Sequence, residues 1–209
     1  MGANVIRPRQ FDDDEAIEAA MQRFWRHGYE ATSVHDLAEA MGIAGPSLSN
    51  AFKDKRPRFV RALGRYCEVT MRARLASLDS EGSQREAIEG LFAQVVKRSL
   101  SDPERRGCFL VNSALEVAPH DAEIGRKIAR YLDEICSFFE RNIRAARAIG
   151  QIGRVIDSCA TASQLLATLL GIRVLARASP DRVVLENAAQ SVLAALGPAR
   201  PSTQRTSKP

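Results

Sequence analysis

The sequence predicts an all-α fold of about nine helices. Apolar residues recur three or four positions apart through nearly all of the 209 residues, which is the spacing of one helix face. No strand-length window alternates strictly between apolar and polar residues, and β-branched residues are diluted by Ala, Leu, Arg and Glu. A sheet is therefore not expected.

The helix ends are marked by prolines and acidic residues. Pro103, Pro119 and Pro180 lie between stretches of helical periodicity, where a missing backbone amide does least harm. An acidic residue follows each of them in the expected first turn of the next helix: Glu104, Asp121 and Asp181. These signals predict helices over residues 12–27, 34–41, 45–51, 54–79, 83–100, 105–117, 121–148, 158–178 and 181–196.

The first two expected helices are separated by a turn with clear capping residues. Gly28 follows the first helix and suits the left-handed conformation of a C-terminal cap. Ser33 is well placed as the N-cap of the second helix, with Asp36 three residues later as its partner in a capping box. The second helix is therefore expected to begin at Val34 and to end at Gly42.

The third expected helix, at 45–51, is too short to be stable alone in water, because helix nucleation is costly. Leu48 and Phe52 lie four residues apart and are expected to face the core. Two short helices joined by a Gly turn are the arrangement of a helix-turn-helix, whose second helix reads base edges in the DNA major groove. The residues left for that outward face are small or polar: Gly45, Ser47, Ser49 and Asn50.

A run of cations follows directly and begins with Lys53 and Lys55. Residues 53–65 contain six Lys or Arg side chains against Asp54 alone, an excess of five positive charges. In isolation such a run is most often a solvated helix face. Its position after the third helix favours contacts with DNA phosphates, which supply most of the affinity of DNA-binding proteins.

Residues 16–63, AIEAAMQRFWRHGYEATSVHDLAEAMGIAGPSLSNAFKDKRPRFVRAL, resemble the N-terminal DNA-binding domain of the TetR/AcrR family of transcriptional regulators. The GY, TS, LA, MGI, PSL and F-x-x-K elements fall in register. The resemblance implies an all-α homodimer, in which three N-terminal helices bind a palindromic operator and a variable helical C-terminal domain binds a small ligand. The family is mostly repressors, so the resemblance also implies a repressor that is released from DNA by a small-molecule inducer.

The resemblance assigns roles to individual positions. Ser33 and Lys55 would contact phosphates, and His35 would lie near the groove edge. The residues that would face bases are Gly45, Pro46, Ser47 and Asn50.

The chain departs from the family pattern at two positions of the third helix. Ser49 stands where the family usually has a Tyr that reaches the DNA backbone, and Ala51 stands where a His is common. Both changes remove contacts, so a ligand-binding or interaction protein of the same fold that has lost operator binding is the alternative function. An enzyme is not expected, because the sequence shows no nucleophile with a base in sequence context, no Gly-rich phosphate loop and no set of metal ligands. No cofactor or metal is expected either.

The resemblance also divides the chain. Residues 1–56 would form the helix-turn-helix DNA-binding domain, and residues 57–196 the ligand-binding and dimerisation domain, with the helix at 54–79 linking the two. Residues 197–209 lack apolar periodicity and are rich in Pro, Ser and Thr, so a disordered tail is expected.

A ligand pocket is expected in the second domain. The helix at 121–148 has a broad apolar face, which is first of all core, but part of it is expected to line a cavity. Asn112 and Glu116 lie one turn apart in an apolar helix and suit the polar groups of a pocket, although a solvent-exposed helix edge explains them equally well. For Cys108 a redox-sensor role is open, and a buried structural thiol is favoured. The candidate pocket residues are Cys108, Phe109, Asn112, Glu116, Tyr131, Ile135 and Phe138.

The last two helices are expected to form the dimer interface. Their apolar stripes are too extensive to remain in contact with water, and small residues such as Ala167 and Gly171 allow helices to approach closely. Packing against the same helices of a second subunit would give a four-helix interface; alternatively, one helix of the pair packs wholly within its own subunit. The candidate interface residues are Leu165, Leu169, Ile172, Leu175, Leu185 and Val192.

The composition fits a globular, mildly basic protein with a formal net charge of +5. No window reaches about 18 consecutive apolar residues, and the N-terminus lacks the apolar centre of a signal peptide, so neither membrane insertion nor export is expected. The expected partners are double-stranded operator DNA, a small-molecule effector and a second copy of the chain, with no membrane. The expected location is the cytoplasm.

Overall fold

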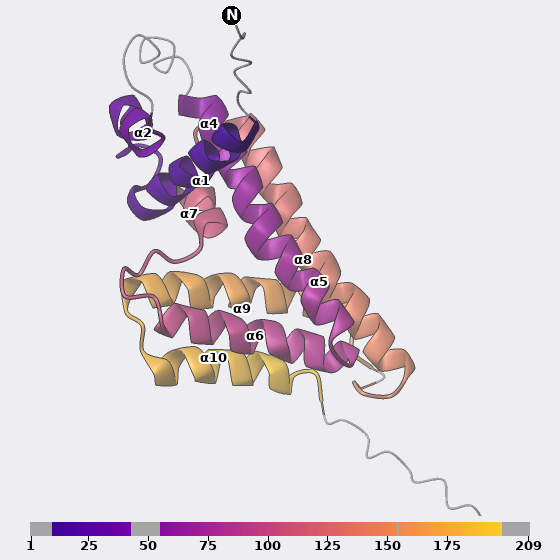
Figure 1. Cartoon of the computed structure of the whole chain (residues 1–209). Coiled ribbons are helices and arrows are strands. Elements are labelled where there is room, and N and C mark those ends of the chain that lie inside the picture. Colours follow the sequence, from indigo (N-terminus) through magenta and orange to yellow (C-terminus); the bar gives the residue numbers. More distant parts are fainter. Residues whose placement is uncertain (1–9, 43–54, 154, 198–209) are drawn as a thin grey trace, which may run out of the picture. The chain divides into compact units, whose positions relative to one another are not determined.

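The computed structural model describes residues 10–42, 55–153 and 155–197, and these residues form helices and turns without strands (Figure 1). The all-α fold predicted from the sequence is confirmed. The expected third helix at 45–51 lies outside the described residues. The helices are α1 Gln10–His27, α2 Val34–Ala40, α4 Lys55–Tyr66, η1 Cys67–Arg72, α5 Ala73–Ser80, α6 Gln84–Leu100, α7 Phe109–Glu116, α8 Ala122–Ala148, α9 Ser158–Ala178 and α10 Arg182–Ala194.

Capping residues explain why most helix ends lie close to their expected positions. Ser83 caps α6, with its side chain accepting from the Glu86 N–H and the Glu86 side chain accepting from the Ser83 N–H. Asp157 and Asp181 cap α9 and α10, each accepting hydrogen bonds from two backbone N–H groups of the first turn. Such caps depend on neighbours in sequence, so the sequence alone locates them.

One helix begins later than expected. The periodicity predicted a helix from residue 105, but α7 begins at Phe109. Arg105 and Gly107 have φ angles of 49° and 71°, which lie in the left-handed region and cannot continue a right-handed helix. Glu104 is therefore not in the first turn of a helix.

A second departure lies inside the long helix expected at 54–79. The chain is helical from Lys55 to Ser80, but its middle section, Cys67–Arg72, is a π-helix. A π-helix closes its hydrogen bonds over one more residue than an α-helix, and the spacing of the apolar residues gives no sign of it. The segment thus divides one expected helix into α4 and α5.

The chain packs as two compact units. Residues 1–73 and 108–129 form one, called here the front unit, and residues 74–107 and 130–209 form the other, called the rear unit. The front unit therefore holds α1, α2, α4, η1, α7 and the beginning of α8. These units are defined by packing, whereas the boundary predicted at residue 56 divides the DNA-binding from the ligand-binding residues and stays a prediction.

The core of the front unit is aromatic. α1 packs against α2 and α4, and α7 packs against both α1 and α4. Phe59 of α4 lies at the centre, with its ring edge-to-face against Phe24 of α1 at 5.1 Å and against Phe109 of α7 at 5.5 Å between centroids. All three side chains are buried. Aromatic pairs of this geometry contribute about 0.5–1.5 kcal/mol each beyond their buried area, so they join three helices that are distant in sequence.

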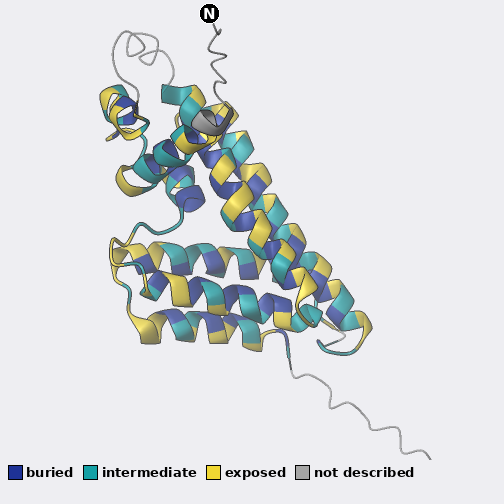
Figure 2. Ribbon diagram, in the orientation of Figure 1, coloured by how far each residue is buried: buried dark blue, intermediate teal, exposed yellow. Residues whose placement is uncertain are grey.

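In the rear unit, α6, α9 and α10 contact one another pairwise. Figure 2 shows buried residues repeating along one side of each of these helices. Arg85 of α6 joins α6 to two loops. Its guanidinium donates to the carbonyl oxygens of Gln151 at 3.1 Å and Gly197 at 2.7 Å. Two loop carbonyls are thereby held at the start of α6.

Most of the residues predicted for the dimer interface are buried within their own chain. Side chains already buried within their own chain have no surface left for a partner, so they form the core of the rear unit. Of the six predicted residues, Leu175 is exposed, at 44%. The five that are buried are Leu165, Leu169, Ile172, Leu185 and Val192.

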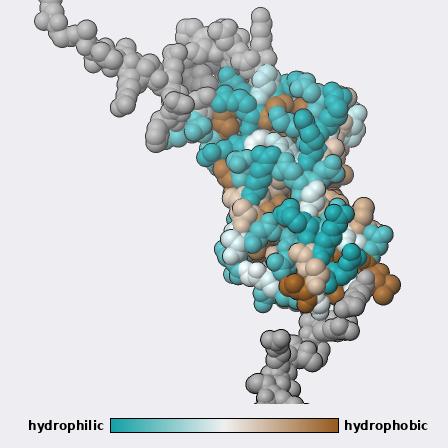
Figure 3. Space-filling view, turned by 90° about the vertical axis from the view of Figure 1, so that its right-hand side faces the viewer, coloured by the Kyte–Doolittle hydropathy of each residue, from teal (hydrophilic) through white to brown (hydrophobic). Residues whose placement is uncertain are grey.

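Large exposed apolar residues are nevertheless concentrated on these two helices. On the face shown in Figure 3 the described surface is mainly hydrophilic, with hydrophobic side chains in small patches. Within the described chain, α9 and α10 contribute four large apolar side chains that are at least 44% exposed: Val174, Leu175, Val183 and Val184.

Candidate nucleic-acid interface

The structure describes some of the predicted DNA-binding residues and not others. Ser33, His35 and Lys55 are described, and they flank the segment 43–54 in sequence. The residues of that segment lie outside the description: Gly45, Pro46, Ser47, Ser49, Asn50 and Lys53.

The turn between α1 and α2 has the predicted caps. Gly28 has a φ of 87°, and its N–H donates to the carbonyl of Phe24 at 2.8 Å. Both hydrogen bonds of the predicted capping box are present, since Ser33 Oγ accepts from the Asp36 N–H at 3.0 Å and Asp36 Oδ2 accepts from the Ser33 N–H at 2.8 Å. α2 begins at Val34, as expected.

Ser33 is engaged beyond its role as a cap. Its hydroxyl also donates to Asp36 Oδ2 at 2.8 Å, and the hydrogen bonds from Ser33 are the main reason that the pKa of Asp36 is lowered. Arg23 of α1 pairs with the same carboxylate at 2.9 Å. A phosphate bound by the exposed Ser33 would compete with Asp36 for the hydroxyl proton. His35 is exposed in the first turn of α2.

Lys55 is the first residue of α4 and contacts the turn that precedes α2. Its Nζ lies 4.3 Å from the centroid of the Tyr29 ring, a cation–π contact, and 3.5 Å from the carbonyl oxygen of Glu30. Burial is the main cause of the raised pKa of Tyr29, with the Glu30 carboxylate adding to it. The phenol therefore stays neutral, and Lys55 is held over its ring without a carboxylate partner in the described part of the chain.

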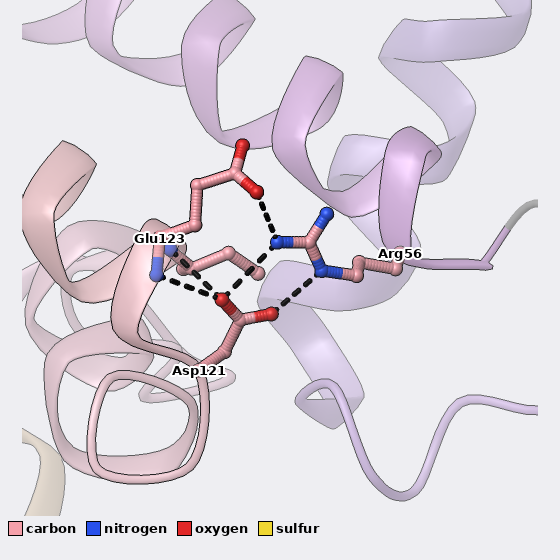
Figure 4. Close-up of polar contacts among 4 residues, drawn as sticks. Arg56, Asp121 and Glu123 are labelled. Carbon is pink, nitrogen blue, oxygen red and sulfur yellow. Dashed lines mark hydrogen bonds and ion pairs between the residues drawn. The ribbon is translucent and has the colours of Figure 1, made fainter.

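Arg56, the next residue, pairs with carboxylates of the α7–α8 corner (Figure 4). Its Nε lies 2.6 Å from Asp121 Oδ2, and the terminal nitrogen Nη2 lies 3.2 Å from Asp121 Oδ1 and 2.7 Å from Glu123 Oε2. The hydrogen bonds from Arg56 are the largest cause of the low pKa of Asp121, about 2, and those to Asp121 and Glu123 raise the pKa of Arg56. Both groups are fully charged at neutral pH.

Asp121 also begins α8. Its Oδ1 accepts from the backbone N–H groups of Glu123 at 3.1 Å and Ile124 at 3.0 Å, in the manner of an N-cap. These bonds to the backbone further lower the pKa of the carboxyl group. One side chain thus joins the start of α8 to the start of α4.

Glu116, at the end of α7, contacts the turn between α1 and α2. Its two carboxylate oxygens accept from the backbone N–H groups of Tyr29 at 3.0 Å and Glu30 at 2.9 Å. A Cβ on Gly28 would lie 2.9 Å from Glu116 Oε2, closer than real Cβ contacts, so the absence of a side chain there allows this approach. Glu116 thus holds the turn between α1 and α2, and its place in a ligand pocket stays a prediction.

These contacts could not be predicted from local sequence patterns. Arg56 and Asp121 are 65 positions apart, and Glu116 and Tyr29 are 87 apart. Among the other cations of the run, Arg58 lies 3.1 Å from the sulfur of Met41 and Arg65 lies 3.7 Å from Glu18. Part of the predicted cationic run is therefore directed at the protein itself.

The candidate pocket residues are divided between the two units. Cys108, Phe109, Asn112 and Glu116 belong to the front unit, where the Tyr66 hydroxyl donates to Cys108 Sγ at 3.4 Å. The other three are buried in the rear unit: Tyr131, Ile135 and Phe138. The pocket that would combine all of them stays a prediction.

A groove of about 650 Å³ lies elsewhere in the rear unit, between α6 and α10. Its apolar lining includes Phe92, Val96 and Leu193, and its polar lining includes Lys97 and the ion pair of Arg182 with Glu186 at 3.0 Å. None of the seven predicted pocket residues lines it.

Comparison with known protein families gives two matches. Residues 16–57 match a sequence model of the bacterial regulatory proteins of the tetR family, and residues 84–192 match that of the tetracyclin repressor-like C-terminal domain. Together the matches cover the expected helix-turn-helix and most of the rear unit.

Individual relatives agree with these matches. The chain is 33% identical over 177 residues to the uncharacterized HTH-type transcriptional regulator YezE of Bacillus subtilis (strain 168), covering 84% of this chain and 91% of the relative. It is 36% identical over 123 residues to the HTH-type transcriptional repressor ComR of Escherichia coli (strain K12), covering 58% of this chain and 59% of that repressor. A solved structure of a cysteine mutant of the TetR family transcriptional regulator CifR, complexed with 26-bp double-strand operator DNA, superposes with a TM-score of 0.77 at 33% identity, covering 91% of this chain and 99% of that one.

The Arg56–Asp121 pair predicts a specific dependence of stability on pH. The folded-state pKa of Asp121 is lowered from 3.8 to about 2, so its contribution to stability is complete above about pH 4 and is lost as the pH falls toward 2. Replacing Asp121 with Asn retains a good N-cap but removes the charge. We expect Asp121→Asn to melt at a lower temperature than the wild type at pH 7, and the two melting temperatures to converge below pH 4. A difference that stays constant from pH 7 to pH 2 would show that the pair is not formed.

Proposed function

The chain belongs to the TetR family of bacterial regulatory proteins, and from this premise we propose that it is a homodimeric repressor that binds a palindromic operator and is released by a small-molecule effector. The observation that carries the proposal is its similarity, over 91% of the chain, to a family member solved in complex with operator DNA. Its relatives are transcriptional regulators, so we assign it no enzymatic activity and place its action on DNA in the cytoplasm.

The proposed DNA contacts combine the segment 43–54 with its described flanks. Bases would be read by the outward residues of the third helix, and phosphates would be bound by residues beside it. Lys55 suits a phosphate, because its ammonium lies at the start of α4, next to the segment, and has no carboxylate partner in the described chain. The departures at Ser49 and Ala51 from the family pattern concern which operator is chosen.

Homodimerisation is supported by the free face of α9. The buried residues of α9 recur at 158, 162, 165, 169, 172 and 176, so the opposite face carries Ala160, Ala167, Gly171, Val174 and Ala178. That face has no charged residue, and a Cβ on Gly171 would meet nothing within 4 Å. Small uncharged residues allow a second helix to approach closely.

α10 has a matching free face. Its buried residues Leu185, Ala189 and Val192 turn toward the rear core, and Val184, Ala188 and Ser191 lie along one flank of this buried stripe. The residues of α10 that line the groove, such as Arg182 and Glu186, lie away from this face. A dimer formed through α9 and α10 would therefore leave the groove open.

The composition of α9 fits a protein partner. The helix Ser158–Ala178 has the length and hydropathy of a membrane span, with a mean hydropathy of 1.5, and 28% of that window is buried within the chain. Because its buried face packs on α6 and α10 of the rear unit, it is already a helix of the folded core. A second copy of the same two helices would cover what remains.

We propose that the effector binds in the rear unit. Two sets of residues suit it: the three predicted pocket residues that belong to this unit, Tyr131, Ile135 and Phe138, and the groove between α6 and α10, whose volume of about 650 Å³ lies in the usual range for small-molecule sites. An effector acts on DNA binding only if its affinities for the DNA-bound and free conformations differ. Release from the operator requires tighter binding to the free conformation.

Operator binding is tested by selecting duplexes from a random-sequence pool with the purified full-length protein. We expect a palindromic sequence to be enriched and to bind at least a thousandfold more tightly than non-specific DNA, the lower end for specific regulators. Failure to enrich any sequence, with a folded protein and low salt, would favour the alternative, a protein of the same fold that no longer binds DNA.

The phosphate contact of Lys55 is tested by the salt dependence of binding. Lys55→Ala should weaken binding to all sequences about equally, and the slope of log K against log salt should become shallower by about one per half-site. Arg98→Ala, which removes an equal charge from an exposed position on α6, is the matched control and should leave the slope unchanged. Equal slopes for the wild type and Lys55→Ala would remove Lys55 from the phosphate contacts.

The dimer interface is tested by placing a charge on the free face of α9. Val174→Asp should shift the protein from dimer to monomer in light scattering, because burying an unpaired carboxylate in an apolar interface costs several kcal/mol. Leu115→Asp makes the same kind of change at a position of α7 that is 67% exposed, and it should remain a dimer. A dimeric Val174→Asp protein would place the interface elsewhere.

A further inference from the structure

The corner between α7 and α8 carries three carboxylates that contact the parts of the chain on either side of the predicted third helix. Glu116 ends α7, Asp121 precedes α8, and Glu123 lies in the first turn of α8. Their partners lie before and after the segment 43–54 in sequence, and all of these residues belong to the front unit. A role of these contacts in operator binding rests on the proposed function.

The first contact fixes the chain before α2. Both oxygens of Glu116 accept backbone N–H groups, from Tyr29 at 3.0 Å and from Glu30 at 2.9 Å. Hydrogen bonds to a charged acceptor are roughly twice as strong as neutral ones, and bonds to the backbone hold the chain itself. The turn leading to α2 is therefore positioned by the end of α7.

The second contact fixes the chain after the segment. Asp121 receives two hydrogen bonds from the Arg56 guanidinium, at 2.6 and 3.2 Å, and Glu123 receives one at 2.7 Å. A two-point contact with a planar guanidinium sets its orientation as well as its distance. Because Asp121 also caps α8, the first turn of α4 is positioned by the first turn of α8.

Lys55 connects the two contacts. It precedes Arg56, and its Nζ lies over the Tyr29 ring at 4.3 Å, beside the backbone that Glu116 holds. The residue that we assign to a phosphate is thus placed between two points that the corner fixes. The orientation of the Lys55 side chain therefore depends on both the Glu116 contact and the Arg56 contact.

Arg56 would ordinarily be assigned to a phosphate as well, because it is a cation next to a DNA-reading helix. Its guanidinium instead already has two carboxylate partners, which a phosphate would have to displace. The same carboxylates would repel an approaching phosphate. The geometry therefore favours a contact within the protein.

We propose that Glu116 and Asp121 are positioning residues for operator binding, and that Arg56 serves this positioning and does not contact a phosphate. The corner is then part of the DNA-binding region, although it lies about sixty residues beyond the end of the helix-turn-helix match at residue 57. The helix that begins at this corner, α8, is a single helix from Ala122 to Ala148.

The charge of Asp121 gives a test in which two explanations predict opposite signs. Removing a negative charge near DNA should tighten binding to every duplex if only long-range electrostatics acts. A positioning role predicts that Asp121→Asn binds the selected operator more weakly, on the order of tenfold, while its affinity for poly(dI-dC) is unchanged or higher. The ratio of operator to non-specific affinity is the quantity to measure.

Asp181→Asn is the matched control. Asp181 caps α10 as Asp121 caps α8, accepting from the N–H groups of Val183 at 2.8 Å and Val184 at 3.1 Å, but no arginine partner is found for it in the described chain. This variant removes the same charge and keeps the same kind of cap. Its affinity ratio should equal that of the wild type.

Arg56 provides a second readout. Arg56→Ala should lower operator affinity with a salt slope equal to that of the wild type, in contrast to Lys55→Ala. Arg56→Lys keeps the charge but loses the two-point contact, so it should recover little of the affinity ratio. A shallower slope for Arg56→Ala would show that Arg56 contacts a phosphate and would overturn the proposal.

The remaining outcomes are also decisive. Operator and non-specific affinities that rise together in Asp121→Asn, or a wild-type ratio in both Asp121→Asn and Glu116→Gln, would overturn the positioning role. If circular dichroism shows that Asp121→Asn does not fold, Glu116→Gln and Arg56→Lys carry the same test. A wild-type protein that selects no sequence would instead contradict the proposed function itself, and the two failures are therefore distinct.

Discussion

The front unit depends on the contacts that the α7–α8 corner makes with α1 and α4. Glu116 accepts two backbone N–H groups of the α1–α2 turn, and Asp121 pairs with Arg56 at the start of α4. Behind these polar contacts, Phe109 of α7 completes an aromatic core with Phe59. The family match ends the DNA-binding region at residue 57, whereas the packed unit includes residues 108–129. Part of what holds the DNA-binding region in place is therefore supplied by the later part of the chain.

The rear unit meets a different constraint, because α9 and α10 pack in its core and also expose uncharged residues. One face of each helix packs with α6, and the free surface includes uncharged residues such as Ala167 and Val174 of α9 and Val184 of α10. Water is a poor solvent for such a face, and a symmetric partner is the simplest way to cover it. The groove between α6 and α10 lies on another side of α10, so the proposed dimer interface and a ligand in the groove would not compete for the same residues.

Local features of this structure could be predicted from the sequence, and contacts between distant residues could not. The capping box of Ser33 and Asp36 and the left-handed Gly28 follow from residues a few positions apart. The partners of Arg56 and Glu116 lie 65 or more positions away, so the cationic run looked free and Glu116 looked like a pocket residue. The apolar stripes of α9 and α10 were recognised, but periodicity does not say which face meets the subunit's own core, and the residues proposed for the interface were mostly core. The two short helices and the cationic run indicated DNA binding, and the family resemblance supplied the repressor function and its effector.

Backbone hydrogen exchange at Tyr29 and Glu30 in the free protein tests most directly whether the α7–α8 corner positions the DNA-binding region. If Glu116 positions the turn before DNA arrives, both amides should exchange slowly without DNA and rapidly in Glu116→Gln. Rapid exchange of both amides in the wild-type protein until operator DNA is added would contradict this positioning role. The turn between α1 and α2 would then be ordered by DNA and not by the corner.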